Sequence, residues 1–447
     1  MTRGVRLNRN RRRAFATLLV FGVILIASVV TGVLQSTAFG QAAAGREALA
    51  RVRATWAARA GVEATIARLE FDTDSEAGGD AYRVLDDMAA EAVGTLAGAS
   101  WRIATWEGKT ELPGPSDAHA RLNVNALTRD QLLAIEPLMT EDVADAVLDW
   151  VDADDDTREL GAEIGYYASL PYPYEPRNAP MRTLQELELV AGVRAEDVRG
   201  EDWNLNGVLD PGENDGDSSW PRDNADDVLD RGWSGVLTAE SLEGTLAPSG
   251  EEKLDLTVAS EEDLVDRLGV TRDQAKVVID HVGTSAEAAL ADFITRDLAT
   301  LALAAGGGGQ GSAGVEALTS EQLGLLLDEC RVGPASEGAF EPGRLNINTC
   351  AAETLEYLPE IDAEVADAII AEREARPEGF ASTAELMEVS GIGRRQLAAI
   401  ARLLTVRSTV YVVTSRGRDA RTGLEVEIVA TLDRSSLPVV ISAMVVR

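Results

Sequence analysis

The run AFATLLVFGVILIASVVTGVL, residues 14–34, decides how the rest of the chain is placed. A helix over these 21 residues, at about 1.5 Å per residue, spans the roughly 30 Å hydrocarbon core of a bilayer. Six arginines and no acidic residue precede the run, so the positive-inside rule predicts a cytoplasmic N-terminus. A cleaved secretory signal is the alternative, because residues 35–41 contain small side chains. The run is long for a signal core, and we therefore expect a single membrane span.

The helix is expected to continue beyond the membrane. Apolar residues recur at helical spacing as far as position 69, with arginines between them. These apolar positions are Leu49, Val52, Trp56, Ile66 and Leu69. The pattern predicts one long helix, apolar in its first half and amphipathic in its second half.

Charge and composition exclude several classes of function. The formal net charge is -34, which opposes binding to nucleic acid and to anionic membrane surfaces. Only two histidines are present, so neither a zinc cluster nor a Ser/His/Asp triad is expected. Carboxylate pairs are abundant in so acidic a chain and do not indicate acid–base catalysis. We expect that the protein is not an enzyme.

The chain has two cysteines, Cys330 and Cys350. Both would lie outside the cytoplasm, where disulfides form. The intervening segment contains Gly333, Pro334 and Gly338, which allow the chain to turn back. A Cys330–Cys350 disulfide is therefore predicted, with two separate buried thiols as the alternative.

Strand-like patterns lie near both ends of the extracytoplasmic part. Residues 409–415, 424–433 and 438–446 are β-branched runs separated by turns, which predicts an antiparallel three-stranded meander. Residues 101–106 (WRIATW) predict an earlier strand. The expected fold is α+β: a pilin-like α/β body with a large α-helical region inserted into it.

The inserted region contains a repeat. Residues 121–150, 253–281 and 344–373 each begin with a basic residue and a leucine, followed by Asn or Asp. Each has a second leucine ten residues after the first and continues into an Ala/Val/Ile-rich helix. Thr128 and Ser260 occupy positions expected of helix N-caps. The third repeat continues to Gly391-Ile-Gly393, a helix-hairpin-helix turn, and residues 184–192 end the first repeat in a parallel way.

These boundaries predict eight segments. They are a basic cytoplasmic leader (1–13), the transmembrane helix (14–37), the body helix with its first strand or strands (38–119), a first helical insert (120–200), an acidic calcium-loop region (201–252), a second repeat with a Gly-rich linker at 304–314 (253–343), a helix-hairpin-helix domain of SAM-like type (344–405) and the C-terminal strands (406–447).

The strongest chemical motif is an EF-hand-like loop at residues 202–213. Oxygen-bearing side chains occupy loop positions 1, 3, 5, 9 and 12, a glycine is at position 6, and position 7 offers its backbone carbonyl. The predicted Ca²⁺ ligands are Asp202, Asn204, Asn206, Val208 (carbonyl), Asp210 and Glu213.

Two weaker loops share parts of this pattern. The first has Asp152, Asp154, Asp156 and Glu163 at positions 1, 3, 5 and 12, but Thr157 replaces the glycine. The second has Asn224, Asp226 and Asp230, with Asp215 or Asp217 to complete it. A solvated acidic turn is the alternative for each loop.

Several motifs together resemble type II secretion system protein K, the large minor pseudopilin also called general secretion pathway protein K. They are LNVN (122–125), DWVDAD (149–154), GAE (161–163), YY (166–167), Asn178, LQEL (184–187) and the second LNIN (345–348). The resemblance implies an inner-membrane protein with its bulk in the periplasm. It also implies a place at the pseudopilus tip, where the protein initiates or caps the filament that exports folded proteins. The implied partners are I-type and J-type minor pseudopilins and other secretion-system components.

Two positions depart from the family pattern. A prepilin-peptidase site usually has Gly before the apolar run, whereas here the site would be Ala14-Phe15. The fifth mature position would then be Leu19, whereas other pseudopilins have Glu there. Protein K members also tend to lack this Glu.

Two other functions remain open. A membrane-anchored DNA-binding or DNA-uptake protein is favoured by the basic residues around the last hairpin, Arg373, Arg376, Arg394, Arg395 and Arg402. A calcium-binding surface module would need no pseudopilin partners.

Overall fold

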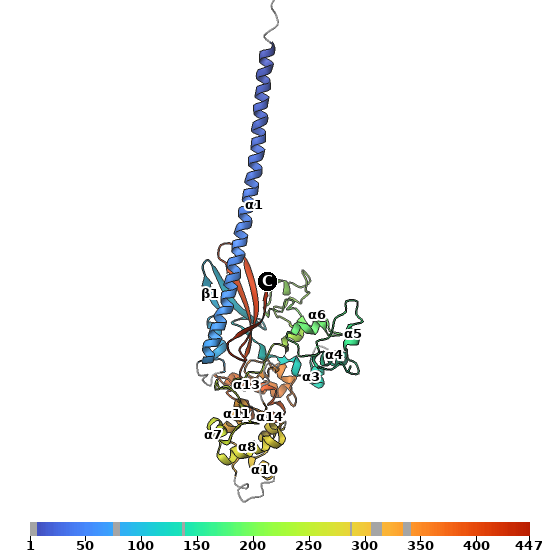
Figure 1. The fold of residues 1–447 in the computed structure, drawn as a ribbon, viewed down its shortest axis with the longest axis vertical. Helices are drawn as coiled ribbons and strands as arrows, with labels where there is room; N and C mark the ends of the chain where they lie inside the picture. Colours follow the sequence, from blue (N-terminus) through green and yellow to red (C-terminus); the bar gives the residue numbers. More distant parts are fainter. Residues whose placement is uncertain (1–6, 75–80, 136–138, 287, 305–314, 334–340) are drawn as a thin grey trace, which may run out of the picture.

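The structure is a computed structural model that describes residues 7–74, 81–135, 139–286, 288–304, 315–333 and 341–447. The 68-residue helix α1 (Leu7–Asp74) projects from the rest of the molecule, which gathers around its C-terminal half (Figure 1). The Gly-rich segment predicted as a linker falls almost entirely at 305–314, outside the described residues.

Helix α1 confirms the predicted long helix. Within the described residues it is the one helix long and apolar enough to cross a membrane, over Phe15–Phe71. Its most apolar window has no residue buried inside the protein. The predicted span, residues 14–37, lies in this free part of α1.

One antiparallel sheet forms the body against which α1 packs, with strand order β1-β2-β11-β12-β13. Strand β3 pairs with β2, and β4 pairs with β11. The predicted C-terminal meander and the predicted strand at 101–106 are both confirmed. The strands are β1 (Val93–Leu96), β2 (Ala99–Glu107), β3 (Thr110–Pro113), β4 (Ser116–Asp117), β11 (Val410–Asp419), β12 (Glu425–Asp433) and β13 (Val440–Val446).

The contact between α1 and the sheet is unusually close at Gly417 in β11. A Cβ atom at this position would lie 2.0 Å from the carbonyl oxygen of Ala54 and 2.4 Å from the amide nitrogen of Ala58. The facing surface of α1 is made of small, buried residues: Ala50, Ala54, Ala57, Ala58 and Val62. Small side chains on both elements let the helix backbone approach the strand backbone.

Each of the three predicted repeats is closed by a pair of two-residue parallel strands. Strand β5 (Leu122–Asn123) pairs with β6 (Leu237–Thr238), β7 (Leu254–Asp255) with β8 (Cys330–Arg331), and β9 (Leu345–Asn346) with β10 (Leu404–Thr405). The leucine-rich start of each repeat is therefore joined to the end of its own helical unit.

The helices of the inserted region are short. The α-helices are α2 (Arg83–Ala90), before the insert, then α3 (Arg129–Ala134), α4 (Glu141–Val151), α5 (Ile164–Tyr167), α6 (Ala195–Arg199), α7 (Glu261–Leu268), α8 (Arg272–Ser285), α9 (Ala289–Thr295), α10 (Leu298–Ala304), α11 (Ser320–Glu329), α12 (Ala352–Glu356), α13 (Ala363–Ala375) and α14 (Arg394–Ile400). The 3₁₀ turns are η1 (Ala118–Ala120), η2 (Val124–Ala126), η3 (Leu184–Leu189), η4 (Pro211–Glu213), η5 (Gly232–Gly235) and η7 (Thr383–Glu388). Thr128 and Ser260 cap α3 and α7, as predicted.

The second asparagine of each Leu-Asn-x-Asn motif ties the start of its repeat to a distant turn. Asn125 donates to the Met181 carbonyl (3.0 Å) and accepts from the Met181 amide (2.6 Å). Asn348 makes the same pair of bonds with Phe380, at 3.0 and 2.7 Å. The motif therefore has a structural role, because it satisfies buried backbone groups.

The hairpin turns of the first and third repeats also match. Gly391 has φ +91°, and a Cβ atom there would lie 2.8 Å from the Val365 side chain in α13. Gly192 likewise has φ +82°, and a Cβ atom there would lie 3.0 Å from the Val143 side chain in α4. Positive φ and close packing both favour glycine here. The predicted helix-hairpin-helix turn at Gly391 is thus present.

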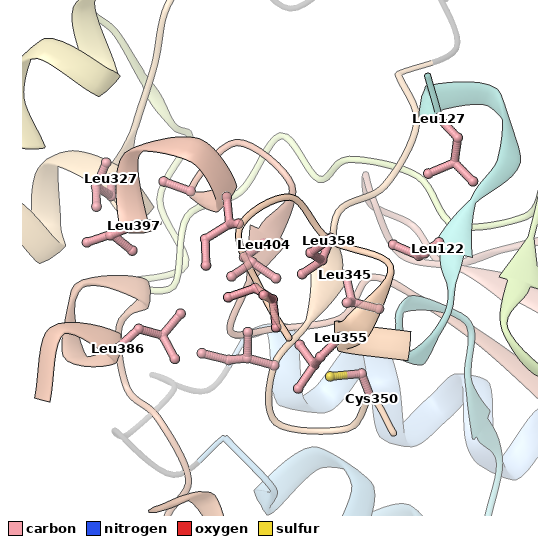
Figure 2. Close-up of a cluster of buried hydrophobic side chains, with 14 of the residues drawn as sticks. Leu122, Leu127, Leu327, Leu345, Cys350, Leu355, Leu358, Leu386, Leu397 and Leu404 are labelled. Carbon is pink, nitrogen blue, oxygen red and sulfur yellow. The ribbon is translucent and has the colours of Figure 1, made fainter. Parts of the chain in front are cut away.

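One continuous hydrophobic core joins the repeats. Figure 2 shows leucines of the first repeat, of α11 and of the third repeat in this cluster, with Cys350 among them. Cys330 and Cys350 are both free thiols, so the structure lacks the predicted disulfide. Cys330 is held in β8 by pairing with β7, whereas Cys350 follows β9, which pairs with β10. Burial raises the pKa of each thiol to about 12, which keeps both protonated.

We predict that Gly417→Ala destabilises the protein, because the new methyl group would overlap the backbone of α1. The free energy of unfolding should fall by about 1–3 kcal/mol, as overpacking typically costs. Gly165→Ala is the matched control, since a Cβ there meets no atom within 4 Å. Thermal unfolding of the full chain in detergent measures both variants, and equal stability would show that α1 does not rest on Gly417 as described.

Candidate functional site

The EF-hand-like loop at 202–213 folds around its first and last carboxylates. Asp202 is buried and accepts hydrogen bonds from the amides of Asn206 (2.9 Å) and Gly207 (3.0 Å). Glu213 closes the loop by accepting from the amides of Trp203 (3.0 Å) and Asp210 (3.1 Å). The Asp and Glu predicted for loop positions 1 and 12 are therefore brought together, and Val208 between them is buried.

The middle of the loop is held by Asp210. One of its carboxylate oxygens accepts from the side-chain amides of Asn204 (2.9 Å) and Asn206 (3.0 Å), and the other from Arg416 of β11. Arg416 also pairs with Glu427 of β12 at 2.8 Å. A protein guanidinium thus supplies part of the positive charge that these carboxylates require.

Burial nevertheless opposes ionisation in this loop. It raises the pKa of Asp202 and, with the nearby charges of Asp202 and Asp210, raises that of Glu213 to about 7. A bound cation would remove this penalty. To bind it, the amides of Asn204 and Asn206 would have to turn their oxygens inward, because their nitrogens now donate to Asp210.

The loop also attaches the helical region to the sheet. Trp106 of β2 donates its amide to the Gly207 carbonyl at 2.9 Å, and the Thr414 hydroxyl of β11 donates to the Asn206 carbonyl at 2.7 Å. Any ion that ordered this loop would also order the junction between the two parts of the protein.

The loop at 152–163 has the clearer unsatisfied acceptors. Glu163 is 3% exposed, and neither of its carboxylate oxygens has a hydrogen-bond donor in the described structure. One oxygen each of Asp152 and Asn178 is likewise buried without a donor. Burial, followed by the charges of Asp149, Asp152 and their neighbours, raises the pKa of Glu163 to about 7. These four oxygens are of the kind that Ca²⁺ prefers.

Only part of the negative charge around Glu163 is balanced by a cationic side chain. Arg158 pairs with Asp149 at 2.6 Å and with Asp152 at 2.5 Å. Asp154 accepts from the Asp156 amide at 2.9 Å, and the Asp156 side chain is exposed. The described structure therefore places Glu163 and Asp152 inward and Asp156 outward.

Asn178 was missing from the predicted ligand set of this loop. It is distant in sequence, but its amide donates to the Asp154 carbonyl (3.0 Å) and to Asp155 (2.8 Å). Its φ of +45° is a conformation that asparagine tolerates better than most residues. Its presence among the family-like motifs was the available signal.

The third acidic loop gathers around Glu201. The Glu201 carboxylate accepts from the amides of Asn224 (3.1 Å) and Asp230 (3.3 Å), and burial raises its pKa. Asp226 accepts from the Val228 amide at 2.8 Å. The residues expected to complete this loop are engaged elsewhere: Asp215 bonds Ser219, and Asp217 lies 3.6 Å from Arg222. Glu201, which the spacing pattern did not single out, is the carboxylate that the amides of this loop meet.

Across the described ranges, no group of three or more His, Cys, Asp and Glu side chains is arranged to hold a metal ion by itself. Amide and carbonyl oxygens would have to complete each loop, as the EF-hand pattern assumes. Calcium binding therefore stays a prediction. The possible processing site, Ala14-Phe15, lies within α1, with the Phe15 side chain exposed.

The comparisons with known proteins agree with the sequence motifs. Residues 117–200 match the family model for the type II secretion system (T2SS), protein K, and residues 343–405 match that for the helix-hairpin-helix motif. The resemblance to protein K is thereby confirmed over the first helical region. The predicted hairpin motif is confirmed over the third repeat.

Two individual proteins are similar to this chain. The type II secretion system protein K of Pectobacterium carotovorum subsp. carotovorum is 41% identical over 56 residues, which are 12% of this chain and 17% of that protein. The chain thus aligns with less than a fifth of that relative's length. A chain in the crystal structure of the GspK-GspI-GspJ complex from the enterotoxigenic Escherichia coli Type 2 Secretion System is 12% identical, with a TM-score of 0.41 over 90% of this chain and 99% of that chain.

Proposed function

Because residues 117–200 carry a type II secretion system protein K domain, we propose that this chain is the large minor pseudopilin at the tip of a pseudopilus. In this position it initiates or caps the filament that exports folded proteins. The family match is the observation that carries the proposal. Its location is the inner membrane, with the N-terminus in the cytoplasm and the bulk in the periplasm. The one candidate span among the described residues supports the anchor, and the six arginines before the apolar run support the orientation.

The body has a surface suited to packing against other pseudopilin helices. A groove of about 740 Å³ lies between the second half of α1 and the edge strand β13, lined by Trp56, Arg59, Met444 and Val446 among others. Trp56 is 62% exposed in this groove. An exposed apolar surface of this kind favours a protein partner. The partners that we propose are the I-type and J-type minor pseudopilins.

The position of the helical region supports a place at the tip. It lies at the end of the sheet opposite the apolar half of α1 (Figure 1). A further subunit stacked beyond the membrane-distal end would meet these helices rather than another shaft. Leu19, in place of the acidic residue of other pseudopilins, agrees with a subunit that has no neighbour above it.

DNA binding is less well supported, because four of the five arginines around the last hairpin are engaged within the chain. Arg376 contacts the carboxylates of Glu372, Glu385 and Glu388. Arg373 and Arg394 donate to backbone carbonyls, and Arg395 pairs with Glu360 at 3.0 Å. Phosphate contacts would have to replace these bonds against a net charge of -34.

We predict that the full chain, co-expressed with its cognate I-type and J-type pseudopilins in detergent, elutes with them as one ternary complex. Trp56→Ala should weaken the complex, since interfacial tryptophans often contribute at least about 2 kcal/mol. Trp220→Ala is the matched control, because Trp220 is 61% exposed and lies in the acidic loop region. Size-exclusion chromatography separates the outcomes, and elution of this chain alone at micromolar concentration would contradict the proposed function.

We also propose that the acidic loops bind Ca²⁺ and that its role is structural. The unpartnered oxygens of Glu163, Asp152 and Asn178 support the loop at 152–163. The closed EF-hand-like geometry supports the loop at 202–213. Calcium would neutralise carboxylates whose ionised form is now disfavoured by burial, so binding and local folding should be coupled.

Calorimetric titration to millimolar calcium tests this proposal, because extracellular sites of this type often have dissociation constants of about 10⁻⁴–10⁻³ M. Glu163→Gln and Glu213→Gln should each remove one binding event and reduce the rise in unfolding temperature that calcium causes. Glu159→Gln, at an exposed acidic position in the loop at 152–163, should leave binding unchanged. Equal calcium binding by all four proteins would mean that neither loop is a site.

A further inference from the structure

Arg416 is shared between the EF-hand-like loop and the sheet. It lies in β11, directly across the ladder from Glu427 in β12. Its Nε donates to the Glu427 carboxylate at 2.8 Å, and one of its terminal nitrogens donates to Asp210 of the loop. One guanidinium is therefore divided between two carboxylates. The strand register keeps Glu427 beside it whatever partner Asp210 takes.

The loop carries more negative charge than this one guanidinium balances. Three carboxylates belong to its predicted ligand set, and of these Asp210 makes the ion pair with Arg416. In the described structure the other two, Asp202 and Glu213, are buried and accept their hydrogen bonds from backbone amides. A divalent ion carries twice the charge of a guanidinium and would serve all three carboxylates at once.

The ion and Arg416 require the same carboxylate. One oxygen of Asp210 accepts from Arg416, and the other accepts from the side-chain amides of Asn204 and Asn206. The two asparagines must release Asp210 in any case, because their oxygens are the predicted calcium ligands. A guanidinium left on the first oxygen would then be separated from the ion by a single carboxylate and would repel it.

We propose that Arg416 is a built-in competitor of Ca²⁺ at the loop 202–213, exchanging with the ion at Asp210 and then pairing with Glu427 alone. This role of Arg416 rests on the proposed calcium function and adds what sets the affinity of this loop. The exchange improves the charge balance, because the ion serves the three loop carboxylates while Arg416 neutralises Glu427.

The loop stays attached to the sheet during this exchange. Trp106 of β2 and Thr414 of β11 hold the carbonyls of Gly207 and Asn206, and neither bond involves Asp210. Loss of the Arg416 guanidinium should therefore change the affinity for the ion more than it changes the position of the loop.

The test is calorimetric titration of the full chain in a maltoside detergent with calcium, following the binding event that Glu213→Gln removes. Arg416→Gln should lower the dissociation constant of this event at least about fivefold, because it removes a unit charge close to a divalent ion. Arg416→Lys, which restores the charge, should bring the constant back toward the wild-type value. Arg418→Gln is the matched control and should leave it unchanged, since Arg418 lies two residues along the same strand, is 63% exposed and pairs with Glu425.

The outcomes separate the competition from the calcium function itself. An unchanged or weaker Glu213-dependent event in Arg416→Gln would overturn the competition and leave the calcium function standing. An event present in Arg416→Gln but absent from the wild type would support the competition and remove the calcium function of the native loop. No such event in either protein would overturn both.

The wild-type chain gives a second measurement if Arg416→Gln does not fold. With ¹⁵N-labelled arginine, the Nε–H resonance of Arg416 should shift as calcium is added, because its guanidinium loses Asp210 and keeps Glu427. The resonance of Arg418 should stay in place. A calcium titration that leaves the Arg416 resonance unmoved would contradict the exchange.

Discussion

The close approach of α1 to β11 is the constraint on which the rest of the architecture depends. Gly417 leaves no space for a side chain, and the facing surface of α1 consists of alanines and a valine. This contact sets where the shaft crosses the sheet, and so fixes the groove beside β13 and the direction in which the apolar half of α1 leaves the body. Because both backbones meet here, the position of the shaft is set by main-chain atoms rather than by adjustable side chains.

Much of the fold could be predicted because its signals are local. The apolar run predicts α1, and the β-branched runs predict the meander. The leucine spacing predicts the repeats. The parallel two-residue strands that close each repeat could not be predicted, since each joins residues 59 or more positions apart, as in β9 with β10. The free thiols have the same cause. The strands with which β8 and β9 pair, β7 and β10, decide where Cys330 and Cys350 lie, and the length of the intervening segment does not.

The acidic loops illustrate the limit of motif spacing. Spacing alone favoured residues 202–213, where the structure satisfies the carboxylates with amides and with Arg416. It gave less weight to residues 152–163, where Glu163 accepts no hydrogen bond in the described structure. The difference comes in part from Arg416, which lies far away in sequence and which no local pattern connects to the loop at 202–213.

The chain leaves the sheet and returns to it at neighbouring residues, because Asp117 of β4 faces Tyr411 of β11 across one rung of the ladder. To the sheet, the whole helical region is a single loop whose ends are already adjacent. Lengthening such a loop costs little closure entropy and changes no strand register. A body built in this way can carry a larger or smaller helical region without any change to its shaft or sheet.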